Sequence, residues 1–198
     1  MIGGFFRRGG DRRRVIGRLH GAISAAARQP GLYTHLGVPD TVEGRFESLS
    51  LHVYLVLRRL DRLPPPAADV AQELVDSVFA ELDASLRELG VSDMGVGKRM
   101  KKLGASFYGR TSGYDDALKA EGDDALRQVL ARNILGQAAT VQGSHPGGDL
   151  AAAPLAAYVR AAEVALARAD LDALLSAGPP FPEPGAFAGA SLSEERPV

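Results

Sequence analysis

The sequence gathers cations in a segment that a helix could present to a partner. The predicted helix over residues 94–108, extended to position 110, contains five basic residues and no acidic one. On a helical wheel its lysines share one side, and an apolar stripe that ends in Phe107 lies opposite. We therefore expect Phe107 in the core and Tyr108, about 100° further round the helix, at the surface. These residues predict a docking surface for an anionic or apolar partner: Lys98, Arg99, Lys101, Lys102, Tyr108 and Arg110.

Two other interpretations of this basic segment stay open. The first is a solvated lysine face of an ordinary amphipathic helix. The second is pairing with the preceding helix, predicted over residues 67–89, whose polar face is acidic. Nucleic acid is a weaker candidate, because one basic segment in a chain of net charge -1 is a small electrostatic footprint.

Motifs for nucleotide binding or nucleophilic catalysis are incomplete. The run GVGK at residues 95–98 resembles a phosphate-binding loop, but that motif requires glycine at position 92 and serine or threonine at position 99. Ser92 and Arg99 stand there instead. A dinucleotide-binding motif would need glycine where Met100 stands, after a strand that is not predicted. Ser106 does not complete the G-x-S-x-G pattern of hydrolases either.

The histidine and carboxylate positions predict neither a metal site nor a cofactor. The four histidines stand far apart, without metal-ligand spacing, and the chain has no cysteine. His20 and His145 are expected at the surface and His52 at the edge of the core. The pairs 115–116 and 123–124 are interpreted as acidic starts of two short helices. We expect no enzyme; the remaining catalytic alternative is a site shared by His35, Asp115 and Asp116.

Length and composition are those of one soluble domain with tails. The chain has 198 residues, of which 45% are hydrophobic and 24% charged. No uninterrupted apolar run reaches the 18 or so residues of a membrane-spanning helix, so an integral membrane protein is not expected.

The N-terminal segment is basic. Residues 1–28 carry seven arginines and one acid, and Arg18 interrupts the apolar stretch that a secretory signal would need. A cytoplasmic protein is favoured, with an organellar presequence as the open alternative. We expect residues 1–11 to be disordered and residues 12–28 to form an amphipathic helix, whose aliphatic side chains are either docked on the body or available to a membrane. The core is expected to fold without either segment. The predicted contacts with an anionic membrane are Arg12, Arg13, Arg14 and Arg18.

Hydrophobic periodicity predicts an all-α fold, a single compact domain of about six to eight helices. A central helix is expected to begin after Asp40, which forms a capping box with Glu43, and to end before the prolines at 64–66. Further helices are expected over residues 67–89, 94–108, 114–120, 123–135, 150–166 and 171–175. The predicted divisions are a basic N-terminal segment (1–29), a helical domain (30–178) and a proline-rich mobile tail (179–198).

Three segments carry a resemblance to a known family. Residues 32–41 (LYTHLGVPDT) with 44–47 (GRFE), residues 93–102 (DMGVGKRMKK) with 107–111 (FYGRT), and the late helix containing LAAY at 155–158 are the matching parts. Glycines and lysines so dense within one helix are rare by chance. Over residues 30–180 the chain resembles the ubiquinol–cytochrome c chaperone family.

The resemblance implies a non-enzymatic assembly factor for the cytochrome bc1 complex that binds newly made, immature cytochrome b. Mitochondrial members also associate with the ribosome and a small partner protein. The size and the Ala/Arg/Gly-rich composition resemble a bacterial member, peripheral at the cytoplasmic side of the inner membrane; the mitochondrial matrix stays open. The alternative function is an anionic-membrane or nucleic-acid binding module that holds no client.

Overall fold

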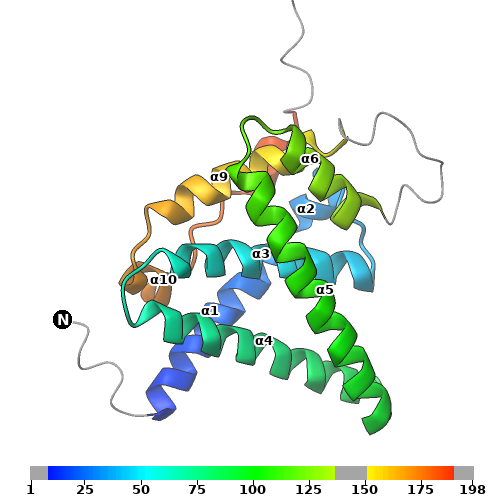
Figure 1. The fold of residues 1–198 in the computed structure, drawn as a ribbon, viewed down its shortest axis with the longest axis vertical. Coiled ribbons are helices and arrows are strands. Elements are labelled where there is room, and N and C mark those ends of the chain that lie inside the picture. The colour runs from blue at the N-terminus through cyan, green and yellow to red at the C-terminus, as the bar shows by residue number, and fades with distance from the viewer. Residues whose placement is uncertain (1–8, 137–150, 190–198) are drawn as a thin grey trace, which may run out of the picture.

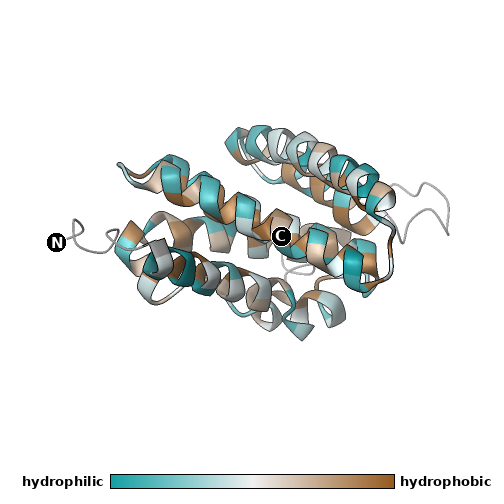
Figure 2. Ribbon diagram, turned by 90° about the horizontal axis from the view of Figure 1, so that it is seen from below, coloured by the Kyte–Doolittle hydropathy of each residue, from teal (hydrophilic) through white to brown (hydrophobic). Residues whose placement is uncertain are grey.

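The computed structural model describes residues 9–136 and 151–189, and all regular secondary structure in these ranges is helical (Figure 1). This confirms the predicted all-α class. Apolar and hydrophilic residues alternate around the helices, as amphipathic packing requires (Figure 2). In the described ranges, no helix combines the length and apolarity that crossing a bilayer would take. His145 lies outside the described residues.

Helix α3 (Val42–Asp61) is central, as its apolar pattern predicts. It packs against helices α1 (Gly9–Ala27), α4 (Ala67–Glu88), α5 (Asp93–Lys119) and α9 (Ala153–Ala167) and against the π-helical turn η1 (Ala131–Leu135). Its N-cap is Thr41, whose hydroxyl accepts a hydrogen bond from the Gly44 amide at 3.0 Å. The predicted cap at Asp40 is wrong: Asp40 instead pairs with Arg45 at 2.7 Å. Gly44 is required at this entry, since a Cβ there would lie 2.0 Å from the carbonyl oxygen of Pro39.

Helix α1 (Gly9–Ala27) packs against α3, α4 and α10 (Leu171–Ser176). It begins at Gly9, so the expected disorder of residues 9–11 is wrong. The side chains of Ile16, Leu19 and Ile23 are at most 5% exposed and belong to the main core. The core is therefore not expected to survive deletion of residues 1–28, contrary to the sequence-based expectation, because their apolar partners would be exposed to water.

Helices α4 (Ala67–Glu88) and α5 (Asp93–Lys119) form a hairpin whose joined ends point away from the other helices (Figure 1). Gly90, with φ of 76°, reverses the chain as a left-handed C-terminal cap. The Val91 amide closes the turn by donating to the Leu86 carbonyl at 3.1 Å. Ser92 caps α5.

Helix α5 is one continuous helix, and the predicted break between residues 108 and 114 is wrong. The buried positions Phe107, Tyr114 and Leu118 continue one inward stripe through the glycine-containing segment. Asp115 and Asp116 consequently lie inside the helix and not at a helix start. Helix α6 (Asp124–Leu130) follows, and the π-helical turn η1 (Ala131–Leu135) extends it.

The C-terminal part of the described chain closes over the core. Helix α9 (Ala153–Ala167) is followed by α10 and by a segment, residues 179–189, that we call the C-terminal strap; it contains η2 (Pro184–Phe187). The ring of Phe181 lies 4.8 Å from that of His52, and the ring of Phe187 lies 5.7 Å from that of Tyr158. The strap thus packs on the body, contrary to the predicted mobility of residues 179–189; residues 190–198 lie outside the described part of the chain.

The strap lies beside helix α2 (Pro30–Thr34) and covers His52, which is fully buried in the core and not at its edge. A Cβ on Gly31 would lie 3.1 Å from Pro184 and Gly185, so glycine permits the close approach. The Nδ1 of His52 donates to the Ser48 carbonyl at 2.7 Å, and its Nε2 accepts from the Tyr158 hydroxyl at 2.8 Å. Burial lowers the pKa of His52 to about 4, which keeps the ring neutral.

Candidate docking surface on the α4–α5 hairpin

The outer side of α5 carries the predicted cations. We call this surface the docking face and define it by exposed residues of α5: Met94, Lys98, Arg99, Lys101, Lys102 and Tyr108. Met94 is 90% exposed and Tyr108 61%, large values for apolar and aromatic side chains. The structure confirms the predicted exposure of the four cations and of Tyr108; their role in binding stays a prediction.

The inner side of α5 attaches the docking face to α4. Val96 and Phe107 are buried, and the Phe107 ring meets the Phe79 ring of α4 edge to face at 6.0 Å. Tyr108 lies against the outer edge of Phe107, with ring centroids 5.4 Å apart. The adjacent aromatic residues therefore separate into core and surface, as the wheel predicts.

The acidic side of α4 does not neutralise the docking face. Glu73 pairs with Arg12 of α1 at 2.5 Å, and Asp83 pairs with Arg87 at 2.6 Å. Glu81 lies 3.5 Å from the His20 ring. Within the residues that the structure describes, no ion pair joins Lys98, Arg99, Lys101 or Lys102 to an acid, so the alternative pairing with α4 is not seen.

Arg110 does not join the other predicted site residues. Its guanidinium turns toward the body, where its Nη2 lies 2.5 Å from the Glu47 carboxylate of α3. The side chain of Glu47 is only 4% exposed. Sequence reasoning missed this contact because the two residues stand on helices whose crossing no local pattern reveals.

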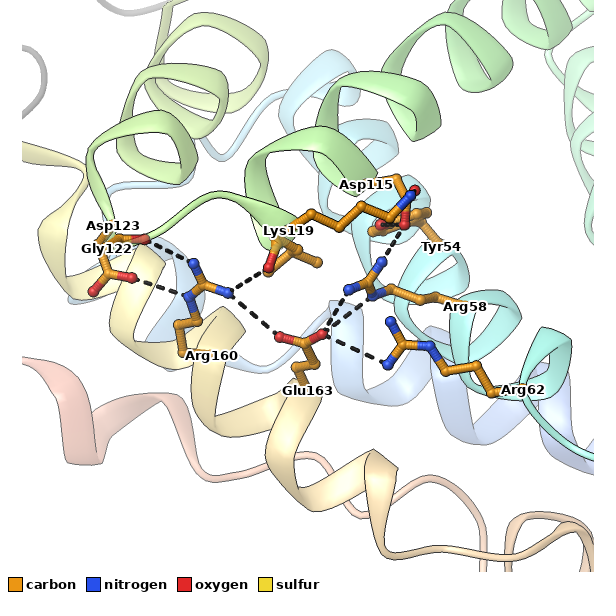
Figure 3. A network of polar contacts seen from close by, with 10 residues as sticks. Tyr54, Arg58, Arg62, Asp115, Lys119, Gly122, Asp123, Arg160 and Glu163 are labelled. Atoms are coloured by element: carbon orange, nitrogen blue, oxygen red, sulfur yellow. Dashed lines mark hydrogen bonds and ion pairs between the residues drawn. The ribbon is translucent and has the colours of Figure 1, made fainter.

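Beyond Arg110, a polar network joins α3, the C-terminal part of α5 and α9 (Figure 3). Sequence reasoning also missed this network. Arg58 of α3 lies between two carboxylates, donating to Asp115 of α5 and to Glu163 of α9, the latter at 2.9 and 3.2 Å. Arg160 of α9 donates to Asp123 at 3.0 Å and to the carbonyls of Leu118 and Gly122. A cation in the apolar stretch of α3 is the one sequence signal that could have pointed to this network.

The arginines predicted to contact a membrane lie on α1, whose apolar side is committed to the core. Arg12 is paired with Glu73, whereas Arg13, Arg14 and Arg18 are exposed. A cavity of about 550 Å³ opens between α1 and α4 beside these arginines, lined by Arg12, Arg13, Ile16, Glu73, Asp76, Ser77 and Ala80.

The residues of the catalytic alternative do not meet in this cavity. His35 is exposed and lies 2.8 Å from the hydroxyl of Thr34. Asp115 is held by Lys119 and Arg58, which lower the pKa of its carboxyl, and Asp116 is exposed.

His20, expected at the surface, is buried: its Nδ1 lies 3.0 Å from the Ser77 hydroxyl, and desolvation lowers the pKa of the ring. Among the described side chains, no three His, Asp or Glu residues are grouped so as to hold a metal ion.

Comparisons with known proteins agree with the resemblance noted in the sequence. No curated protein sequence matches the chain significantly. The crystal structure of the Cbp3 homolog from Brucella abortus matches with a TM-score of 0.71 and 41% sequence identity, over 90% of this chain and 94% of that one. Residues 34–181 match the family described as ubiquinol-cytochrome C chaperone. The chain therefore belongs to the ubiquinol–cytochrome c chaperone family.

Proposed function

We propose that the chain is a non-enzymatic assembly chaperone of the cytochrome bc1 complex, and that it binds immature cytochrome b through the docking face. Family membership supports the assembly role. The observation that carries the location is the exposed set of four cations, unpaired in the described part of the chain, beside exposed Met94 and Tyr108.

The chemistry of this face suits a membrane-protein client outside the bilayer. An unassembled transmembrane helix presents about 20 apolar residues, which flexible methionine and aromatic side chains can contact. The carboxyl ends of such helices carry partial negative charge, and the cations of α5 can bind there. The hairpin presents both groups on one side, away from the rest of the body.

Reversing three charges on the docking face should weaken client capture without unfolding the chain. In a K98E/K101E/K102E variant the substituted heads stay in water, so the midpoint of thermal unfolding should change little. Recovery of newly synthesised cytochrome b from membranes should fall about tenfold or more, measured by pull-down and mass spectrometry.

The matched control reverses three exposed arginines that belong neither to α5 nor to the arginine group of α1, in an R28E/R45E/R168E variant. The control carries the same change of charge as the α5 variant. Full client recovery by the control would therefore place the client contact on α5. Full recovery by the α5 variant would contradict the proposed face. Ribosomal proteins and RNA in the same pull-down, with and without nuclease, test ribosome association and the alternative of nucleic-acid binding.

We further propose that the chain is peripheral at the cytoplasmic side of the inner membrane, attracted through Arg13, Arg14 and Arg18. The apolar side of α1 is buried, so the attraction is electrostatic and each cation contributes about 1 kcal/mol at most. The R13E/R14E/R18E variant should lose most sedimentation with anionic vesicles at low salt, and the wild-type chain should lose it at high salt. Equal sedimentation of both chains would exclude α1 as the contact.

A further inference from the structure

An ion pair that is buried at one end joins α5 to helix α3 at the base of the docking face. Glu47 of α3 and Arg110 of α5 form it, two residues beyond Tyr108. Further along α5, Tyr114 packs against Tyr54 at 5.5 Å, and Asp115 receives Arg58. On the other side of Arg110, the Phe107 ring of α5 packs against the Phe79 ring of α4.

Two buried polar atoms of this ion pair have no hydrogen-bond partner within the described residues. They are Oε2 of Glu47 and Nε of Arg110. Buried polar atoms are almost always paired in native proteins, because an unpaired one has lost its water without compensation. An unsatisfied cluster of this kind is costly, and its position at the base of the docking face suggests a use other than stability.

We propose that Glu47 is a positioning residue: through Arg110 it fixes the rotation and tilt of the α5 segment that carries the docking face. This inference deepens the proposed function, since it explains how a face that packs on α4 is held relative to the body. Arg110 thereby acts on the client indirectly, as the partner of Glu47.

The raised pKa of Glu47 indicates that ionising its buried carboxyl, as the ion pair with Arg110 requires, costs free energy. Burial raises the pKa of its carboxyl to about 7, and Arg110 only partly offsets this effect. The folded chain therefore keeps this proton up to a higher pH than the unfolded chain does. Consequently the free energy of unfolding falls as pH rises from the ordinary range of a carboxyl pKa to about 7. The charged group acting on this carboxyl is Arg110; burial raises the pKa of the nearby Tyr114 hydroxyl, so that group stays neutral in the same pH range.

The test measures the position of α5 without any client. The chain has no cysteine, so spin labels can be placed at G97C on α5, where a Cβ would meet no atom within 4 Å, and at V164C on α9, where Val164 is 53% exposed. At pH 8, with Glu47 ionised, the distance distribution should be narrow. It should broaden as pH falls to 5.5, with a midpoint near the pKa of about 7.

An E47Q substitution in the labelled chain should give the broad distribution at both pH values. Its melting temperature at pH 8 should equal or exceed that of the parent, because the buried carboxylate charge is gone and the Arg110 side chain, which is 24% exposed, can turn to water. Client affinity at pH 8 should fall about fivefold or more. The matched control is D40N, which breaks the exposed pair with Arg45 on the same helix and should keep both the narrow distribution and its pH dependence.

A narrow distribution in E47Q at both pH values would overturn the inference. An unfolded or strongly destabilised E47Q chain would also overturn it, since the pair would then serve core stability. If E47Q does not change the distance distribution and the labelled parent chain still binds cytochrome b, the positioning role is wrong and the proposed function stands. A changed distance in a chain that binds no cytochrome b supports the positioning role and contradicts the proposed function, so the two failures are distinguishable.

Discussion

Replacing Arg58 with alanine should lower the free energy of unfolding by about 3–5 kcal/mol, the range for breaking a buried ion pair by removal of one partner. The Arg58 side chain is only 8% exposed and bonds to both Asp115 and Glu163. Without it, two partly buried carboxylates from α5 and α9 would face each other with less compensation. Urea denaturation followed by circular dichroism measures the loss.

Arg62 provides the matched control for Arg58. It lies one turn further along α3, is 47% exposed and approaches the same Glu163 only at 4.0 Å. An exposed pair of this kind contributes about 1 kcal/mol at most, so R62A should be nearly neutral. Equal losses for R58A and R62A would contradict the view that the buried network connects α3, α5 and α9.

Replacing Phe107 with alanine should cost about 3–5 kcal/mol, as expected for removing a large aromatic side chain from a packed core. Phe107 is 5% exposed and contacts Phe79, so the substitution leaves a cavity between α4 and α5. The hairpin should open locally, which hydrogen exchange of the two helices would report together with the lower unfolding midpoint.

The neighbouring residue Tyr108 is the control for Phe107. At 61% exposure its truncation to alanine should change stability by no more than about 0.5–1 kcal/mol. Client recovery should fall nonetheless, because the ring belongs to the docking face. A Y108A variant that unfolds, or that binds client fully, would remove Tyr108 from the site.

Much of the fold could be predicted because its helices are amphipathic and locally encoded. The spacing of Val70, Leu74 and Val78 gives the buried side of α4, and the wheel of residues 94–108 separates Phe107 from Tyr108 correctly. The cations of the docking face were also predictable, since a lysine without a buried acid to pair with remains in water.

Tertiary contacts explain what the sequence did not reveal. Arg110 resembles the other cations of its helix, and only the crossing of α3 brings Glu47 to it. The aliphatics of α1 have the same pattern whether they contact a membrane or a core. Proline and small residues made residues 179–198 look mobile, yet within the described part of this segment, residues 179–189, Phe181 and Phe187 pack against the core.

The C-terminal strap has a consequence for the timing of synthesis. Its η2 turn closes against α2, roughly 150 residues earlier in the chain, so the cover over His52 is completed only after η2 has been synthesised. At about 5–20 residues per second, translation leaves α2 without this cover for roughly 8–30 s. During that time Leu32 and neighbouring core side chains lack their final cover. We infer that a truncated translation product ending before residue 181 would stay protease-sensitive, and that the nascent chain needs protection until η2 emerges.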